Sequence, residues 1–431
     1  MKYSPLADAL NQDLLNGAPQ VFHMLSERGK AIYFPWKGIL GQTAEAKNAK
    51  INATIGTAFE DDGSPLTLEC IEALVNVPSE SFLYAPSFGM PRLREEWRKL
   101  MVVKNPGLKS KVFSLPVVTA ALTHGLSIAG YLFVDPGDEL IIADLYWDNY
   151  ELVFCEGYGA RFVFYNTFIN GRYDVEAFAR VLCEGKPRKR IVLLNFPNNP
   201  TGYTVTEEEA RELAEAVQKA AEAGNHIVVI LDDAYFGLVY EEGISRESLF
   251  VLLADLHPNV LAVKLDGPTK EDYVWGFRVG FMTFGFQGAS SAHLRALEDK
   301  AAGAIRGNIS NSPCLSQTIL LKAYTDPQYE LQKKQKYETL ANRVKKIKDT
   351  LRAHPEYAQS FEVMPFNSGY FMCVRPIGVD CEALRKELLE NYSTGVIVLS
   401  GLIRLAFSCV PVDLIETMFA NIHAAVQKLR R

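Results

Sequence analysis

The middle of the sequence holds five polar residues whose types and spacing suit covalent and acid–base chemistry. Lys270 stands eight residues before Arg278, and Asn199, Asp232 and Tyr235 precede it in that order. A lysine amine can form an imine with an aldehyde, and an arginine can bind a phosphate through two parallel hydrogen bonds. A carboxylate such as Asp232 can keep a ring nitrogen protonated. A ligand that used all of these groups would carry an aldehyde, a phosphate and a basic ring.

The segments that must position these residues alternate between apolar strands and amphipathic helices. From about residue 65 to 325, this alternation predicts an α/β fold, a mainly parallel sheet with helices on both faces. One predicted helix runs from Thr206 to Ala223, where an N-cap threonine and three acidic residues in the first turn favour the helix start. The predicted strands cover residues 139–144, 161–166, 191–196, 227–233, 260–266 and 279–285.

The candidate residues fall where these strands end. Asn199 follows one predicted strand, Asp232 lies at the end of the next, and Lys270 follows another. In open α/β sheets, ligands bind at the carboxyl edge of the strands. We therefore expect the three side chains to meet there and to hold pyridoxal phosphate (PLP), which has the aldehyde, the phosphate and the ring.

The sequence on either side of this core predicts a smaller α+β domain. The pattern of residues 332–354 predicts a long charged helix, and short strands and a closing helix are predicted after it. The first sixty residues show little helical periodicity, so we expect an arm that lies over a neighbour or completes the small domain. The predicted division is an arm and part of the small domain over residues 1–64, a large PLP-binding domain over 65–325, and a small C-terminal domain over 326–431.

Bulk composition argues against several classes of protein. The 431 residues are 48% apolar and 22% charged, and the net charge of −6 comes with scattered lysine and arginine, so no nucleic-acid binding is predicted. No segment reaches the roughly twenty apolar residues that span a bilayer, and the start lacks the apolar core of a signal peptide. We therefore predict a cytoplasmic protein without membrane contact. Seven dispersed cysteines without a CxxC pair favour neither a metal site nor a disulfide framework.

Three motifs resemble those of the class I/II aminotransferases, which are fold-type I PLP enzymes of the aspartate aminotransferase superfamily. The motifs are NNPTG around Asn199, DDAYF from Asp232, and the spacing from Lys270 to Arg278. The resemblance covers about residues 56–404 and implies a three-layer large domain, PLP as cofactor, and a homodimer with active sites shared across the interface. It also implies that Lys270 forms the internal aldimine with PLP. Lys264 is the rival lysine, but no arginine follows it at the matching distance.

The same resemblance assigns the residues around the cofactor ring. Asp232 would pair with the pyridine nitrogen, and Asn199 and Tyr235 would donate hydrogen bonds to the phenolate oxygen. Asp233 is the adjacent alternative, but Asp232 precedes Tyr235 by the family spacing of three residues, which leaves Asp233 as a capping or solvent-facing group. For Asn199 a simple turn is the competing interpretation. Trp147 would stack on the ring, and packing in the core is its competing interpretation.

The phosphate end is expected at the turn Ala121, Leu122 and Thr123, where backbone N–H groups open the following helix, together with Arg278. The sequence departs from the family pattern here. Ala121 stands where glycine or serine is common, and Gly267 stands where the family often has a hydroxyl residue. One hydroxyl contact to the phosphate is therefore expected to be missing.

Four further residues complete the predicted site by resemblance. Arg404 would bind the substrate α-carboxylate, and the backbone of Gly56 would line the same pocket. Tyr84 would reach the phosphate in the neighbouring subunit, or else pack in the core at a helix end. Arg306 would cross the dimer interface to bind a side-chain carboxylate of the substrate, or else cap its helix or bridge the subunits.

The expected reaction is transfer of an amino group from an L-amino acid to a 2-oxo acid by a ping-pong mechanism. The alternative on the same scaffold is a PLP-dependent carbon–sulfur lyase, because one carbanion can partition in several ways. A ligand-sensing regulator would need a DNA-binding module, and the sequence shows none. Spacing alone does not identify the amino donor.

Overall fold

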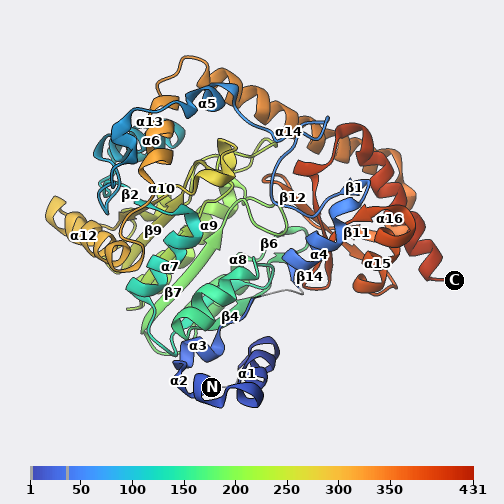
Figure 1. The fold of residues 1–431 in the computed structure, drawn as a ribbon. Helices are drawn as coiled ribbons and strands as arrows, with labels where there is room; N and C mark the ends of the chain where they lie inside the picture. Colours follow the sequence, from blue (N-terminus) through green and yellow to red (C-terminus); the bar gives the residue numbers. More distant parts are fainter. Residues whose placement is uncertain (1–2, 35–37) are drawn as a thin grey trace.

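The structure is a computed structural model of the chain, and it describes residues 3–34 and 38–431. A seven-stranded sheet in the order β2-β10-β9-β8-β7-β3-β4 forms the centre of what we call the large domain (Figure 1). The strands from β9 to β4 in that order run parallel, and β10 is antiparallel to both neighbours. The strands are β2 (Val117–Thr119), β3 (Glu139–Ala143), β4 (Arg161–Tyr165), β7 (Lys189–Asn195), β8 (His226–Asp232), β9 (Val260–Asp266) and β10 (Gly280–Gly285).

The predicted strands and the predicted helix of this core are confirmed. Each predicted strand is present, with ends that differ by at most two residues, and of the seven strands of this sheet only the three-residue β2 was not predicted. The helix α9 (Glu207–Glu222) begins where expected, because the hydroxyl oxygen of Thr206 accepts the N–H of Glu209 and the Glu209 carboxylate accepts the N–H of Thr206. This reciprocal capping box satisfies two N–H groups that the helix itself leaves free.

Helices cover both faces of the sheet, which is why its strands are apolar on both sides. Along β3, Leu140 and Ile142 pack in one apolar cluster with α7 and α12, while Ile141 and Ala143 pack in the opposite cluster with α8 and α9. This alternation follows from the two-residue period of a strand. The large domain is therefore the three-layer α/β structure that the sequence predicts. Its covering helices include α6 (Pro91–Lys104), α7 (Ala121–Phe133), α8 (Val175–Cys183), α10 (Phe250–Leu253), α12 (Ser291–Asn308) and α13 (Cys314–Ala323).

A second apolar core belongs to a four-stranded antiparallel sheet in the order β11-β12-β15-β14. Figure 1 shows this small domain at one side of the molecule, with the long helix α14 running to it from the large domain. α14 confirms the predicted charged helix. The elements are α14 (Tyr329–Ala353), β11 (Phe361–Val363), β12 (Phe371–Pro376), α15 (Cys381–Tyr392), β14 (Ile397–Leu399), β15 (Leu402–Ala406) and α16 (Ile415–Leu429).

The N-terminal segment is more helical than its weak periodicity in the sequence suggests. Its helices are short, which hides their periodicity, but serines at positions 4 and 26 cap two of them. The strand β1 (Ile51–Asn52) pairs with β13 (Thr394–Gly395) and so extends the small domain. Residues 35–37 of the expected arm lie outside the described residues, and the domain boundaries stay a prediction. The helices are α1 (Pro5–Gly17), α2 (Pro19–Met24), α3 (Glu27–Ala31) and α4 (Ile39–Glu45).

The helices of the described part of the chain include none with both the length and the apolar character needed to cross a membrane. The longest of them, α14, spans 25 residues and is rich in lysine.

Candidate active site

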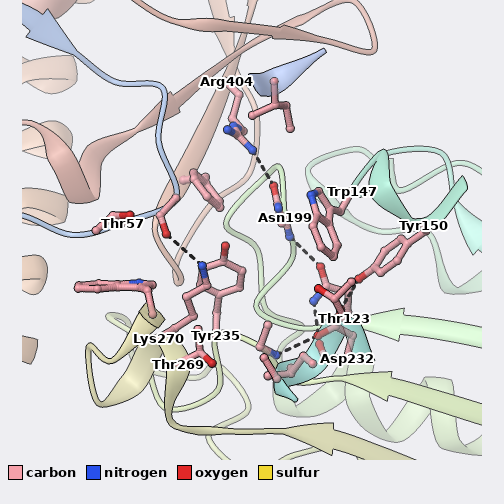
Figure 2. A pocket seen from close by; sticks show the side chains of 18 of the residues that line it. Thr57, Thr123, Trp147, Tyr150, Asn199, Asp232, Tyr235, Thr269, Lys270 and Arg404 are labelled. Carbon is pink, nitrogen blue, oxygen red and sulfur yellow. Dashed lines mark hydrogen bonds between the residues drawn. The ribbon is translucent and has the colours of Figure 1, made fainter. Parts of the chain in front are cut away.

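A cavity of about 350 Å³ lies between the carboxyl edge of the large sheet and the small domain (Figure 2). Asn199 follows β7, Asp232 ends β8, and Lys270 follows β9, while Arg404 comes from β15 of the small domain. All four side chains line this one cavity. The parallel strands bring their carboxyl ends to a common edge, so residues far apart in sequence meet there.

Lys270 lies in the single turn α11 (Pro268–Glu271), and its amine reaches into the cavity. Its Nζ donates a hydrogen bond to the carbonyl oxygen of Gly56 at 3.0 Å, and its own carbonyl accepts one from the Tyr370 hydroxyl. Burial, with Arg278 and Arg404 nearby, lowers the pKa of the Lys270 amine to about 8. Each of these factors disfavours the ammonium form, so a neutral amine is accessible near neutral pH.

Asp232 is buried on the face of β8 that opens into the cavity. The Tyr150 hydroxyl donates to its Oδ2 at 2.6 Å, and the N–H of Ala234 donates to its Oδ1 at 3.1 Å. Burial outweighs these two bonds and raises the pKa of the Asp232 carboxyl to about 6. The Asn195 amide also donates to the Asp232 carbonyl at 2.7 Å, which fixes the backbone at this strand end.

Asp233 and Lys264 belong to a separate buried ion cluster, which corrects the expectation that Asp233 is a capping or solvent-facing group. The Lys264 ammonium lies 2.6 Å from Asp233 and 2.9 Å from Asp266, and all three side chains are buried. Neighbouring residues of a strand point to opposite faces, so Asp233 turns away from the cavity that Asp232 lines. The two carboxylates raise the pKa of Lys264 to about 12 against the effect of burial. Lys264 is therefore a charged structural residue, and the cavity holds only Lys270 of the two rival lysines.

Arg404 is a buried arginine that connects the small domain to the Asn199 turn. Its Nη1 donates to Asn199 Oδ1 at 3.1 Å (Figure 2), and its Nη2 donates to the carbonyl of Thr54 at 2.9 Å. Its guanidinium carbon lies 4.3 Å from the centre of the Phe371 ring. Its Nε has no hydrogen-bond partner in the described part of the chain. A buried arginine with a spare donor is suited to a planar carboxylate ligand.

Two aromatic residues predicted near the ring line the cavity from different sides in Figure 2. Tyr235 is buried, and burial raises the pKa of its hydroxyl, so it is a hydrogen-bond donor at neutral pH. Trp147 is half-buried and contacts Tyr150 edge-on, with the ring centres 5.5 Å apart. It therefore presents part of its surface to the cavity and is not fully enclosed in the core.

The far end of the cavity is formed by the start of α7 and by Arg278. Ala121, Leu122 and Thr123 line it there, and Ala121 adopts the left-handed conformation with a φ of 65°. Gly280 makes this turn possible, because a Cβ atom at that position would lie 2.8 Å from the Ala121 carbonyl carbon. In this chain Arg278 donates to the Trp275 carbonyl at 3.0 Å and is exposed.

The departure at Gly267 has a steric reason. A Cβ atom there would come within 3.0 Å of both the Gly280 Cα and the Val279 carbonyl oxygen. A side chain at position 267 would therefore crowd the backbone where β10 begins. Thr269, two residues further along, lines the cavity and brings a hydroxyl group to it.

A sequence model of the family described as aminotransferase class I and II matches residues 50–422, which is most of the chain. The chain belongs to the class I and II aminotransferases. Its sequence is 26% identical to the aspartate aminotransferase of Geobacillus stearothermophilus over 293 residues, which are 67% of this chain and 68% of that protein. It is 24% identical to the aspartate aminotransferase of Bacillus subtilis over 417 residues, 90% of this chain and 96% of that protein.

The fold agrees with this assignment. The crystal structure of an aminotransferase from Anaerococcus prevotii superposes with a TM-score of 0.82 at 23% identity and covers 95% of this chain and 100% of the other. The protein is thus a fold-type I aminotransferase enzyme, and PLP is its cofactor.

The residues of the cavity fit PLP. Asp232 is a buried carboxyl that forms no ion pair within the described ranges, so a protonated ring nitrogen beside it would supply the missing countercharge. A Cβ atom at Gly56 would lie 3.8 Å from both the Lys270 Nζ and the Tyr235 hydroxyl, so glycine keeps open the wall beside the amine. The start of α7 offers backbone N–H groups to an anion.

Two predicted residues do not line the cavity of this aminotransferase within one chain. Tyr84 is 91% exposed, so packing in the core at a helix end is wrong for it. Arg306 is exposed in the last turn of α12 and donates to the Ser310 hydroxyl at 2.7 Å. Their expected roles in a neighbouring subunit stay predictions.

Two residues that hold Asp232 in place were missed from the sequence. Tyr150, which donates to its carboxylate, lies in the same YWDNY segment as Trp147. Asn195 ends β7 directly opposite Asp232 in the parallel register. The rule that found Asp232, a polar residue at the end of an apolar strand, would also have found Asn195. Nothing in the sequence distinguishes Tyr150 from a core tyrosine.

Proposed function

We propose that this aminotransferase moves the amino group of an L-amino acid to a 2-oxo acid by a ping-pong mechanism, with Lys270 as the residue that binds PLP covalently. The proposal rests on one observation, which is that an amine, a buried carboxyl and a buried guanidinium line the same cavity. The relatives named above are aminotransferases, so a carbon–sulfur lyase is not favoured.

PLP, when bound, supplies an aldehyde that condenses with amines and a protonated ring that accepts the electron pair left when the substrate Cα loses its proton. Asp232 keeps that ring nitrogen protonated, since a buried carboxylate without an ion pair favours a cation beside it. Tyr150 and the N–H of Ala234 orient its two oxygens. Because Asn199 Oδ1 is bonded to Arg404, its NH₂ group is left as a donor to the phenolate oxygen, alongside the Tyr235 hydroxyl.

Lys270 has two tasks that need a neutral amine. It would bind the cofactor covalently through this amine, and the same amine would take up the proton that leaves the substrate Cα. Burial and the two nearby arginines favour the neutral form by lowering its pKa to about 8. The bond to the Gly56 carbonyl holds the amine at the cavity wall.

Arg404 binds the α-carboxylate that amino acids and 2-oxo acids have in common. Its burial strengthens the ion pair, and its free Nε provides a donor beyond the two that Asn199 and Thr54 occupy. The backbone of Gly56 lies beside the same space. Specificity for the side chain must come from other residues, because this contact is the same for every amino acid.

Arg306 is our candidate for recognition of a substrate side chain. We propose a homodimer in which Arg306 and Tyr84 reach the partner subunit's cavity, and Arg306 would then favour aspartate or glutamate in one half-reaction. The aspartate aminotransferases among the relatives and the exposure of both residues support this assignment. The cytoplasmic location stays a prediction.

Reduction with borohydride tests the cofactor assignment. The reduced cofactor should be found on a peptide with Lys270, and Lys270→Ala should abolish this label while the fold is retained. A label on Lys264 would overturn the assignment.

A comparison of amino donors tests the role of Arg306. Arg306→Ala should lower kcat/KM for glutamate far more than for an uncharged donor, and Arg295→Ala, on the same helix and also exposed, should change neither. Equal losses for both donors would leave Arg306 as a structural residue of the interface.

A further inference from the structure

The two residues that follow Lys270 are buried carboxylates outside the active-site cavity. Glu271 lies 2.7 Å from the Lys104 ammonium and 2.8 Å from the Lys333 ammonium, and Asp272 lies 2.7 Å from the same Lys333. Two negative and two positive charges therefore balance directly beside the catalytic lysine. We call these four residues the lysine clamp.

The clamp ties the Lys270 segment to three helices. Lys104 ends α6, and Lys333 lies in the second turn of α14. Two tyrosines at the junction of α13 and α14 complete it, because the Tyr329 hydroxyl donates to Asp272 at 2.7 Å and the Tyr324 hydroxyl donates to Asp272 at 3.2 Å. The two ammonium groups beside the buried Glu271 lower the pKa of its carboxyl, and the two carboxylates beside Lys333 raise the pKa of its amine, so Glu271 and Lys333 both stay ionised at neutral pH.

The helix that holds Lys333 also holds the small domain. Ten residues further along α14, Arg343 donates to the carbonyl of Ser408 and to the carboxylate of Asp61. Ser408 follows β15, the strand that carries Arg404. A single helix thus contacts the segment that carries Lys270 through Lys333 and, through Arg343, the turn that follows the strand of Arg404 (Figure 1).

We propose that Lys333 is a positioning residue for catalysis, which sets the place and the charge environment of Lys270 through Glu271 and Asp272. The proposal deepens the proposed function and rests on the role given there to Lys270. Loss of the Lys333 charge leaves one buried carboxylate uncompensated next to Lys270 and releases the tie between its segment and α14. The excess negative charge favours the protonated, positively charged form of the Lys270 nitrogen. The loosened segment also places the Lys270 amine less accurately.

The charged and titratable groups around Lys270 and Lys333 determine how a pH titration of the bound cofactor is interpreted. Those that act on the Lys270 amine are Arg278, Arg404 and Asp232. Those around Lys333 are Glu271, Asp272, Lys104, Tyr273, Tyr324 and Tyr329. Substitution of Lys333 leaves the first set unchanged, so a shifted titration of the cofactor bound at Lys270 reports the clamp.

The test uses the PLP-loaded enzyme and Lys333→Met. We expect kcat to fall about tenfold or more while KM for the amino donor stays within about twofold, because positioning acts on the reacting amine and leaves the Arg404 contact intact. The midpoint pH of the absorbance titration of the bound cofactor should rise by about 0.5–1 unit. This is less than the pKa shift that a charged group about 4–6 Å from the titrating nitrogen would cause. Lys333→Arg keeps the charge and should restore the titration midpoint.

Two variants make the outcome decisive. Lys334→Met removes the neighbouring lysine of α14, whose side chain is 73% exposed, and should behave as wild type. If Lys333→Met does not fold, Tyr329→Phe removes one hydroxyl from the clamp and should give a smaller change of the same sign. Wild-type kcat and an unmoved titration in the folded variant would overturn the proposal. Borohydride labelling of Lys270 in wild type and variant alike keeps the proposed function separate from this result.

Discussion

The adjacent residues Asp232 and Asp233 should respond in opposite directions when each is changed to asparagine in the cofactor-free protein at pH 7. Asp233→Asn removes the nearer of the two carboxylates that hold the buried Lys264 ammonium, at 2.6 Å against 2.9 Å for Asp266. It also weakens the bond that the Ser248 hydroxyl donates to Asp233. Loss of one partner of a buried ion pair lowers the free energy of unfolding by about 3–5 kcal/mol. Because Asp266 still pairs with Lys264, we expect a loss at the lower end of this range, about 3 kcal/mol.

Asp232→Asn should not lower stability under the same conditions. Burial raises the pKa of Asp232 from 3.8 to about 6, so the folded protein binds this proton more tightly than the unfolded chain. Ionisation of Asp232 therefore costs stability as pH rises from about 4 to 6, by about 3 kcal/mol in total, since one pKa unit corresponds to about 1.4 kcal/mol. Asparagine avoids this cost, so the free energy of unfolding should match or exceed that of wild type at pH 7 and converge on it near pH 4.

Urea unfolding followed by tryptophan fluorescence measures both effects. Trp97 donates to Asp266 at 3.0 Å and so reports on the Lys264 cluster directly. Transamination assays on the PLP-loaded variants should show the reverse order, with Asp232→Asn nearly inactive and Asp233→Asn active while it is folded. If Asp233→Asn unfolded at the wild-type urea concentration, or if Asp232→Asn were the less stable variant, the division of the two aspartates between cavity and core would be wrong.

Three other predictions concern the cavity itself. The rate at which cofactor-free protein binds PLP covalently should rise about tenfold per pH unit below pH 8 and level off above it. The reason is that the pKa of Lys270 is lowered to about 8 and only the neutral amine attacks an aldehyde. Stopped-flow absorbance measures this rate. Arg404→Lys should lower kcat/KM for amino acids about 10²-fold and leave the reaction of a simple amine without a carboxylate unchanged, which steady-state kinetics compares. Gly280→Ala should weaken PLP binding in equilibrium dialysis, because the new Cβ would lie 2.8 Å from the Ala121 backbone, whereas Gly276→Ala meets nothing within 4 Å and should bind normally.

The part of the site that follows from strand ends was predictable from the sequence. Asn199, Asp232 and Lys270 each stand at or just after an apolar run, and parallel strands bring such ends to one edge. Arg404 could be placed only by resemblance, because its strand belongs to a different sheet and no local pattern connects it to the large domain. Its hydrogen bond to Asn199 depends on how the two domains meet.

The errors have physical causes that a linear pattern does not contain. The spacing to Tyr235 leaves Asp233 as a capping or solvent-facing group, but its partner Lys264, which makes it a buried residue, lies 31 positions away on the adjacent strand. The partners of Glu271 are likewise distant, since Lys104 and Lys333 come from helices on either side of it in the sequence. Burial of a charge is decided by such long-range pairs, and a single sequence shows only that both members exist.

Asp232 lines the cavity whereas Asp233 holds a buried ion pair, and this difference matters for the design of variant libraries. A library meant to broaden the substrate range would ordinarily randomise every residue near the Lys270 amine, including both aspartates and the residues after Lys270. The structure separates these neighbours into those that line the cavity and those that hold ion pairs in the protein interior. Diversity placed at Thr57 and Trp275, which line the cavity, would explore recognition, whereas diversity at Asp233 or Glu271 would mostly yield protein that does not accumulate in the cell.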